Sequence, residues 1–183
     1  MKAQKFLSIA FFALVFGTTF AQKSVMVGGA AMLPSKNIIE NAVNSKDHTT
    51  LVAAVKAAGL VETLSSKGPF TVFAPTNAAF DKLPKGTVET LLKPENKAML
   101  SGILTYHVVS GKMNASDIAK AIKAGKGKAT LKTVNGGKLV ASMKGKDLIL
   151  TDENGKTAKV TIADVNQSNG VIHVINAVVT PKA

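Results

Sequence analysis

The sequence GPFTVFAPTNAAF occupies residues 68–80, and NGVIHVINAVVTP occupies residues 169–181. Each block contains an apolar run typical of a buried strand. In the first block Pro75 ends the run, because proline favours an extended residue before it. The second block opens with an Asn-Gly turn and predicts a central strand over residues 171–179. These two strands are the expected centre of the fold.

The rest of the chain changes from helical periodicity to strand alternation. Leu51, Val55 and Ala58 share one face of a predicted helix that Gly59 ends in a left-handed conformation. Further predicted helices cover residues 77–83 with Thr76 as cap, the segment from Pro94 to Tyr106, and residues 116–124 with Ser116 as cap. Hairpin turns are expected at Asn135-Gly136 and Asn154-Gly155. Helices followed by mostly antiparallel strands indicate an α+β domain.

Between the two blocks lies LTYHVV, residues 104–109, with a Tyr-His pair at the predicted end of a helix. The three segments, in this order, resemble the fasciclin domain with its two signature blocks and intervening Tyr-His pair. The resemblance covers residues 36–181. It implies a wedge-shaped β-sandwich with N-terminal and edge helices. The chain also resembles exported single-domain bacterial members closely.

The first 21 residues have a pattern of their own. Lys2 and Lys5 precede an apolar run over residues 6–16, and small residues at Thr19 and Ala21 suit cleavage after Ala21. We therefore predict a signal peptide over residues 1–21, a loosely held extension over residues 22–35, and a secreted or periplasmic domain. The alternative is an N-terminal core helix. No transmembrane segment is expected after signal removal, and the chain has no cysteine for disulfides or a lipid anchor.

The chain is strongly basic, with a formal net charge of +12, and every basic side chain is lysine. Without arginine or aromatic-rich ribbons, sequence-specific nucleic-acid binding is disfavoured. Lysines concentrate in residues 112–146, where Asp117 is the single acidic residue. This pattern indicates a polyanion patch with Lys123, Lys126 and Lys128 as candidates, and a polyanion-binding envelope protein as one possible function. A simply solvated lysine surface is the alternative.

The three histidines, His48, His107 and His173, lack the spacing of a zinc site, so no metal or cofactor is expected. We expect His48 to be exposed, and His107 and His173 to be partly buried with hydrogen-bonded rings. The chain has no Gly-x-Ser-x-Gly elbow and no cysteine nucleophile. Asp152-Glu153 is explained by a hairpin turn. The sequence therefore predicts a protein that is not an enzyme.

The resemblance implies an interaction function. In animal fasciclin domains an Asp followed by an aliphatic residue, together with the Tyr-His region, is implicated in binding integrins and matrix. The matching positions here are Asp164-Val165, Tyr106-His107 and Val108-Val109, although the surroundings of Asp164 depart from the animal pattern. We expect Asp164-Val165 at an accessible loop or strand end. Alternatively, Asp164 caps the turn through Asn166, and Tyr106-His107 is structural.

The predicted function is adhesion or surface and extracellular-matrix interaction, with an extracellular protein, glycan or surface polymer as partner. A carrier of an apolar small molecule, such as a carotenoid or lipid, is an alternative. In that case residues 26–33, 108–109, 139–143 and 148–150 would line a groove.

Overall fold

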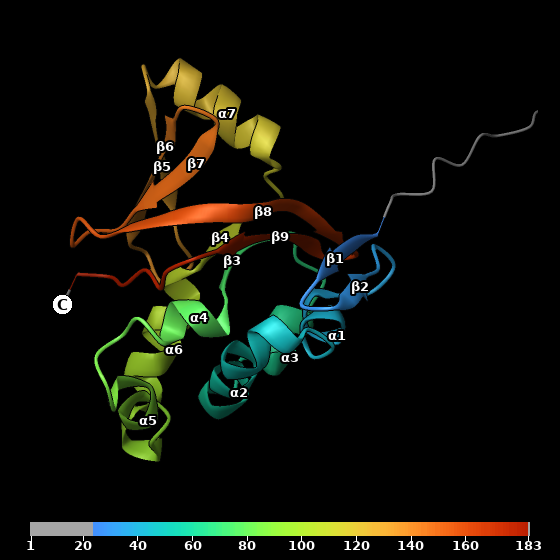
Figure 1. Cartoon of the computed structure of the whole chain (residues 1–183), viewed down its shortest axis with the longest axis vertical. Helices are drawn as coiled ribbons and strands as arrows, with labels where there is room; N and C mark the ends of the chain where they lie inside the picture. The colour runs from blue at the N-terminus through green and yellow to red at the C-terminus, as the bar shows by residue number, and fades with distance from the viewer. Residues whose placement is uncertain (1–23, 183) are drawn as a thin grey trace, which may run out of the picture.

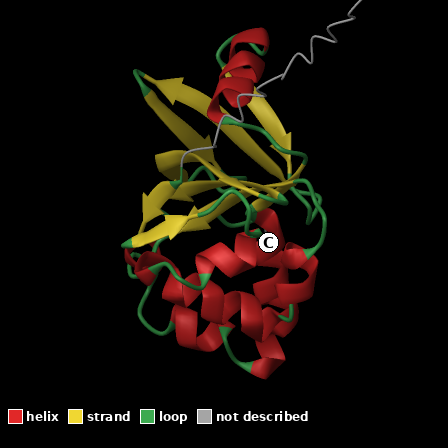
Figure 2. Ribbon diagram, turned by 90° about the vertical axis from the view of Figure 1, so that its right-hand side faces the viewer, coloured by secondary structure: helices red, strands yellow, loops and turns green. Residues whose placement is uncertain are grey.

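The computed structural model describes residues 24–182, so the predicted signal peptide lies outside the described residues. Most helices gather at one end of the molecule and the strands at the other, where α7 lies beside them (Figure 1, Figure 2). The helices are α1 (Ile38–Ala42), η1 (Lys46–His48), α2 (Thr49–Ala58), α3 (Val61–Ser65), α4 (Asn77–Phe80), α5 (Thr87–Leu91), η2 (Pro94–Asn96), α6 (Lys97–Tyr106) and α7 (Ala115–Ala124). The strands are β1 (Val25–Val27), β2 (Ala30–Met32), β3 (Phe70–Pro75), β4 (Val108–Ser110), β5 (Lys128–Lys132), β6 (Lys138–Lys144), β7 (Asp147–Thr151), β8 (Thr157–Gln167) and β9 (Gly170–Ile175).

The two sequence blocks pair side by side as β3 and β9 in the middle of a seven-stranded sheet. The strand order is β4-β3-β9-β8-β7-β6-β5. β3 and β9 are parallel, with Phe73 opposite His173, and the other neighbouring strands of this sheet are antiparallel. β9 ends at Ile175, four residues earlier than expected, because its partner β3 ends at Pro75 directly opposite. The central position of the strand is confirmed.

The sheet curves until its two edges meet. Val109 of β4 forms a β-bridge with Thr133, which follows β5. The Val134 N–H also donates to the Val108 carbonyl over 2.7 Å. Closure removes the unpaired edges that an open sheet would expose. The observed α+β fold is thus a sheet nearly closed into a barrel, with helices against it.

Two hydrophobic cores lie on opposite faces of β3 and β9. Val72, Ala74 and Val174 pack with helices α1 to α6. Phe73 and Ile175, on the other face, pack inside the barrel with Ile118 and Ile122 of α7. Alternate residues of these strands therefore serve different cores, which explains why both strands are apolar on both faces.

The N-terminal extension differs from the prediction. Residues 24–34 form the β1–β2 hairpin, in which Val27 and Met32 are buried in the first core. The Lys46 N–H donates to the Gly28 carbonyl over 3.1 Å, and Leu33 N–H donates to the Asn41 side chain over 3.0 Å. Buried apolar side chains and these hydrogen bonds hold the segment against the domain.

Two helices differ at their ends. α4 ends at Phe80, because residues 81–83 form a turn before Pro84, and Thr76 makes no side-chain hydrogen bond as its cap. α7 starts at Ala115, and its cap is Asn114 rather than Ser116. The left-handed Gly59 and both Asn-Gly hairpin turns are confirmed. Within residues 24–182, no helix combines the length and apolar character needed to cross a bilayer.

Candidate functional site

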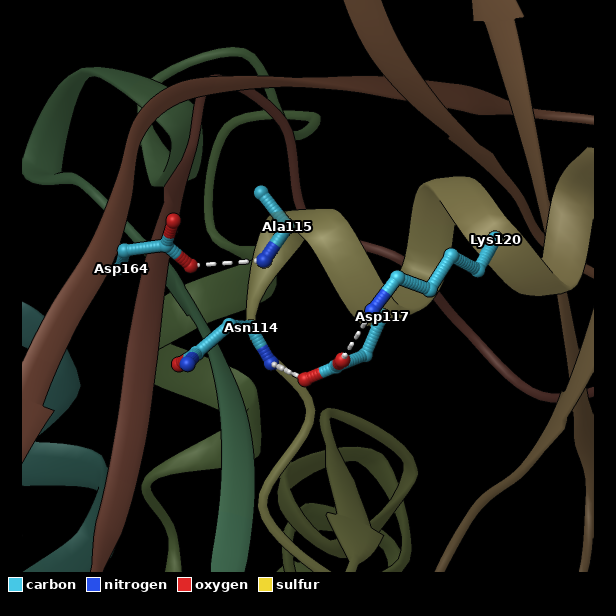
Figure 3. A network of polar contacts seen from close by, with 5 residues as sticks. All are labelled: Asn114, Ala115, Asp117, Lys120 and Asp164. Carbon is cyan, nitrogen blue, oxygen red and sulfur yellow. Dashed lines mark hydrogen bonds and ion pairs between the residues drawn. The ribbon is translucent and has the colours of Figure 1, made fainter.

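Asp164 lies inside β8, where the register with β9 shifts between Ile162 and Val165. Its φ of 59° is in the left-handed region, which aspartate tolerates better than most residues because its short polar side chain bonds locally. The bulge turns the carboxylate toward α7. Oδ1 accepts a hydrogen bond from the Ala115 N–H over 2.6 Å (Figure 3). Asp164 is therefore a cap for α7, supplied by another element.

The first turn of α7 carries a second carboxylate. Asp117 accepts a hydrogen bond from the Asn114 N–H over 3.1 Å and lies 3.8 Å from the Lys120 ammonium (Figure 3). Free N–H groups give a helix N-terminus a partial positive charge, so both carboxylates are favourably placed there. Neither sequence alternative for Asp164 included this role. Asn166 instead donates its side-chain amide to the Asp164 carbonyl.

His173 connects the same bulge to the loop before α7. Its Nε2 donates to the Met113 carbonyl over 2.9 Å, and its Nδ1 accepts from the Asp164 N–H over 3.3 Å. The ring is fully buried and stacks on Phe73, with centroids 5.6 Å apart. Burial lowers the pKa of His173, against the opposing effects of the Met113 carbonyl and the Asp164 charge. The expected buried, hydrogen-bonded ring is confirmed.

His107 is likewise a structural residue. Its Nδ1 donates to the Ile103 carbonyl over 2.8 Å, and its Nε2 accepts from the Val179 N–H over 3.2 Å. Burial lowers its pKa to about 4. This ring joins the end of α6 to the C-terminal segment, so the predicted hydrogen-bonded ring is confirmed, although it is fully rather than partly buried.

Tyr106, the other member of the Tyr-His pair, contacts the barrel on the side away from His107. Its hydroxyl donates to the Lys138 carbonyl over 2.6 Å and accepts from the Glu153 N–H over 3.2 Å. Burial raises the pKa of Tyr106 to about 12. The Gly137 backbone packs so closely on the ring that a Cβ there would lie 2.7 Å from it. Tyr106 therefore positions the β5–β6 and β7–β8 hairpins, which contain the two Asn-Gly turns.

The candidate interaction residues do not form an accessible set. Val165 is 1% exposed, and the remaining members apart from Asp164 are also buried: Tyr106, His107, Val108 and Val109. The expectation that Asp164-Val165 lies at an accessible loop or strand end is wrong, because Val165 enters the first core and Asp164 faces α7. In this conformation a partner cannot contact the Val165 side chain.

His48 also differs from its prediction. It is 3% exposed rather than solvated, and its Nδ1 lies 2.9 Å from the Ser45 hydroxyl. Burial lowers its pKa, and contact with the Ala74 backbone partly offsets this effect. The three histidines belong to η1, the end of α6 and β9. Among residues 24–182, no three histidine or acidic side chains converge as metal ligands would.

The prediction of a carrier groove lined by the four apolar segments is wrong. A mostly apolar cavity of about 50 Å³ lies between the helices and the sheet, lined in part by Val27, Met32 and Val108. The other two segments contribute Leu139 and Leu150 to the second core, inside the barrel. β3 and β9 separate the two cores, so the four segments cannot line one groove.

The candidate polyanion residues are exposed. Lys123 belongs to α7, Lys126 to the turn after it, and Lys128 begins β5. Sequence reasoning placed them together, and the structure distributes them over the helix and the sheet that it covers. Lys132 and Lys138 were not singled out, although strand alternation indicates that both point away from the core.

The match to known proteins covers both sequence blocks and the Tyr-His pair. The model of the family described as "Fasciclin domain" matches residues 46–181, most of the described chain. The chain belongs to the fasciclin domain family. A structure of a FAS1 domain pair from the insect cell adhesion molecule Fasciclin I matches with a TM-score of 0.70 and 18% identity, covering 79% of this chain and 51% of that one. That likeness concerns the fold.

Relatives extend over several kinds of organism. Protein sll1483 of Synechocystis is 49% identical over 164 residues, covering 87% of this chain and 82% of that protein. Immunogenic protein MPB70 of Mycobacterium bovis is 35% identical, covering 78% and 67%. Transforming growth factor-beta-induced protein ig-h3 of Sus scrofa is 34% identical over 92% of this fasciclin chain, which spans 22% of that protein.

Proposed function

We propose that this fasciclin protein is a non-enzymatic adhesion module that acts outside the cytoplasm by binding an extracellular or surface partner. The family match over residues 46–181 carries the proposal, since one structural neighbour is a cell adhesion molecule. One relative, MPB83 of Mycobacterium bovis, is named a cell surface glycolipoprotein.

The chemistry of the central residues supports a binding role over a catalytic one. Tyr106, His107 and His173 are buried, and each is hydrogen-bonded to backbone groups that hold the barrel together. A general acid or base must reach a substrate proton, which these rings do not. These three titratable side chains therefore stabilise the fold.

Export is the first part of the proposal to test. Expression of the full chain in a bacterial host, followed by fractionation and mass spectrometry, should give protein that starts at Gln22 outside the cytoplasm. Folded extracytoplasmic protein that retains Met1 contradicts cleavage, and folded protein confined to the cytoplasm contradicts the proposed location.

Adhesion itself is tested with beads that carry the purified protein. Coated beads should attach to cells or to deposited extracellular matrix more than beads coated with heat-denatured protein or with an unrelated lysine-rich protein of similar charge. Attachment no greater than that of the charge-matched control overturns the adhesive function. Because Val165 is buried, Val165→Ala should change attachment only as far as it unfolds the protein.

A further inference from the structure

We propose that the open face of strands β5 to β8 binds a linear anionic polysaccharide. On these strands, alternate residues such as Ala129, Leu131, Leu139 and Ala141 are buried in the second core, on the side that α7 covers. Side chains at the intervening positions point to the opposite face. We call this surface the lysine face, and its members are Lys128, Thr130, Lys132, Lys138, Val140, Ser142, Lys144, Asp147, Ile149, Thr151, Thr157 and Lys159.

The register of the strands arranges the lysines around a neutral centre. Lys132 is directly opposite Lys138 at one end of the face. Lys128, Ser142, Ile149 and Lys159 form one row across four strands, and Lys144 is opposite Asp147 at the other end. Like charges directly opposite in a sheet are destabilising, so the Lys132–Lys138 pair opposes folding and is suited to an anion placed between the two ammonium groups.

Acidic side chains offset only part of the positive charge, because the face carries five lysines and two carboxylates, those of Asp147 and Glu153, lie on it or beside it. All nine lysines in residues 112–146 are exposed. On the face, the Asp147 carboxylate forms an ion pair with Lys159 over 2.8 Å. Glu153, beside Lys138, accepts from the backbone N–H groups of Lys138 and Lys182. The lysines of β5 and β6 therefore present their charge to solvent, where a polyanion can meet it.

The centre of the face favours a polysaccharide over other polyanions. β5 to β8 contain no aromatic residue, so bases of a nucleic acid would have nothing to stack on. Val140 and Ile149 are partly buried, and they do not provide the broad apolar surface of a membrane-bound amphipathic helix. Thr130, Ser142 and Thr151 supply hydroxyl groups between the lysines, and these can hydrogen-bond to sugar hydroxyls and sulfates.

This inference rests on the proposed adhesive function and names the surface that would serve it. The lysine face also differs from the patch that was predicted from the sequence. Lys128 is kept, whereas Lys123 and Lys126 lie on α7 and the turn after it, on the covered side of the sheet.

The test measures binding of the purified protein to immobilised heparin, a sulfated polysaccharide, at several salt concentrations. Replacing Lys128, Lys132 and Lys138 together by Gln should weaken binding by about tenfold or more, and it should lower the slope of log affinity against log salt by about 2, for three lost contacts. The matched control replaces Lys85, Lys93 and Lys97, three exposed lysines near α5 and α6, and removes the same net charge. The control should change affinity by less than about threefold.

A second variant tests the centre of the face. Ser142→Glu places a carboxylate among the lysines and should weaken heparin binding without removing any of them. Thermal melting of each variant checks that it is folded. Equal losses for the two lysine triples would show that net charge alone attracts heparin, and overturn the proposal. So would a larger loss from Lys120→Gln, Lys123→Gln and Lys126→Gln, or tighter binding to oligo-dT or to phosphatidylglycerol vesicles than to heparin.

Failure of the face and failure of the adhesive function are distinguishable. If the lysine-face triple loses heparin binding but its coated beads attach normally, the adhesive function stands and uses another surface. If wild-type beads attach no better than charge-matched controls while heparin binding follows the prediction, the face stands and adhesion is wrong.

Discussion

Asp164 shows how a single residue can be recognised from sequence and still have an unexpected role. Its left-handed backbone and its hydrogen bond to Ala115 belong together, because the bulge that requires the positive φ also aims the carboxylate at α7. Strained backbone at such a position often accompanies function. Here the left-handed backbone of Asp164 is explained by the hydrogen bond that caps α7 at Ala115, 49 residues earlier in the sequence.

Substitutions of Asp164 should separate the cap from the backbone preference. Asp164→Asn keeps a residue that tolerates the left-handed region and loses a charge near the helix N-terminus, so we expect a cost of about 0.5–1 kcal/mol. Asp164→Ala also loses the hydrogen bond and should cost about 2–3 kcal/mol. Urea denaturation gives both values. Asp147→Ala, at an exposed ion pair, is the control, and an equal cost for the two alanine variants would contradict the capping role.

The buried histidines predict a definite pH dependence. Burial lowers the pKa of His48, His107 and His173 below the ordinary value of 6.5, to about 4 for His107. Between these values the unfolded chain binds more protons than the folded one, so stability rises with pH there. Stability from His107 is complete above about pH 6.5, and about 3 kcal/mol of it is lost as pH falls toward 4.

Free energies of unfolding measured by urea denaturation across this pH range would check the prediction. His107→Gln should be less stable near neutral pH and should show a flatter decline toward acid, because one of the three groups no longer titrates. A wild-type free energy that is constant between about pH 6.5 and 4 would refute it.

At the scale of elements, the parallel pairing of β3 and β9 depends on a close approach of their backbones. A Cβ on Gly170 would lie 2.1 Å from the Phe70 carbonyl oxygen. That oxygen is part of the strand, so it cannot move aside as a flexible side chain would. Asn169, the preceding residue, fixes the approach further by donating its side-chain amide to the carbonyls of Leu64 and Ser66.

Gly170→Ala should therefore destabilise the protein by about 2 kcal/mol or more, the order of an overpacked core. Gly102 provides the matched control, since it lies inside α6 and a Cβ there meets nothing within 4 Å. Gly102→Ala should raise stability by about 1 kcal/mol through helix propensity. Denaturation midpoints of the two variants should move in opposite directions, and a shared sign would contradict the close-approach argument.

At the scale of the whole molecule, folding concentrates positive charge. The formal net charge is +12, and the nine lysines of residues 112–146 lie on α7, β5 and β6 and on the segments that flank them. Self-repulsion of this kind opposes the compact state and is screened by salt. Two cores, one on each face of β3 and β9, supply the opposing apolar burial.

Adding sodium chloride up to about 0.2 M should thus raise the melting temperature of the protein. Lys132→Gln removes one member of the opposed Lys132–Lys138 pair, so it should stabilise the fold by a few tenths of a kcal/mol and reduce the response to salt. Lys97→Gln, on the helical side, removes the same charge and serves as control. Identical salt responses for the two variants would show that the repulsion does not come from the Lys132–Lys138 pair.

Sequence alone determined the features that depend on near neighbours. Alternation and turn chemistry predicted the two Asn-Gly hairpins, helical spacing predicted the buried face of α2, and two apolar runs predicted the central strands. Each of these patterns reports one residue's relation to others a few positions away. The positions of Gly59 and of the two Asn-Gly turns follow for the same reason.

Tertiary structure decided which residues meet and which remain exposed. His48 is buried because the β1–β2 hairpin and the helices close around it, and Val165 is buried because the bulge in β8 turns it into the first core. His107 finds its second partner 72 residues away, at Val179. The lysine face likewise needs the register of four strands. Contacts between distant segments fix these outcomes, and no local period in the sequence records such contacts.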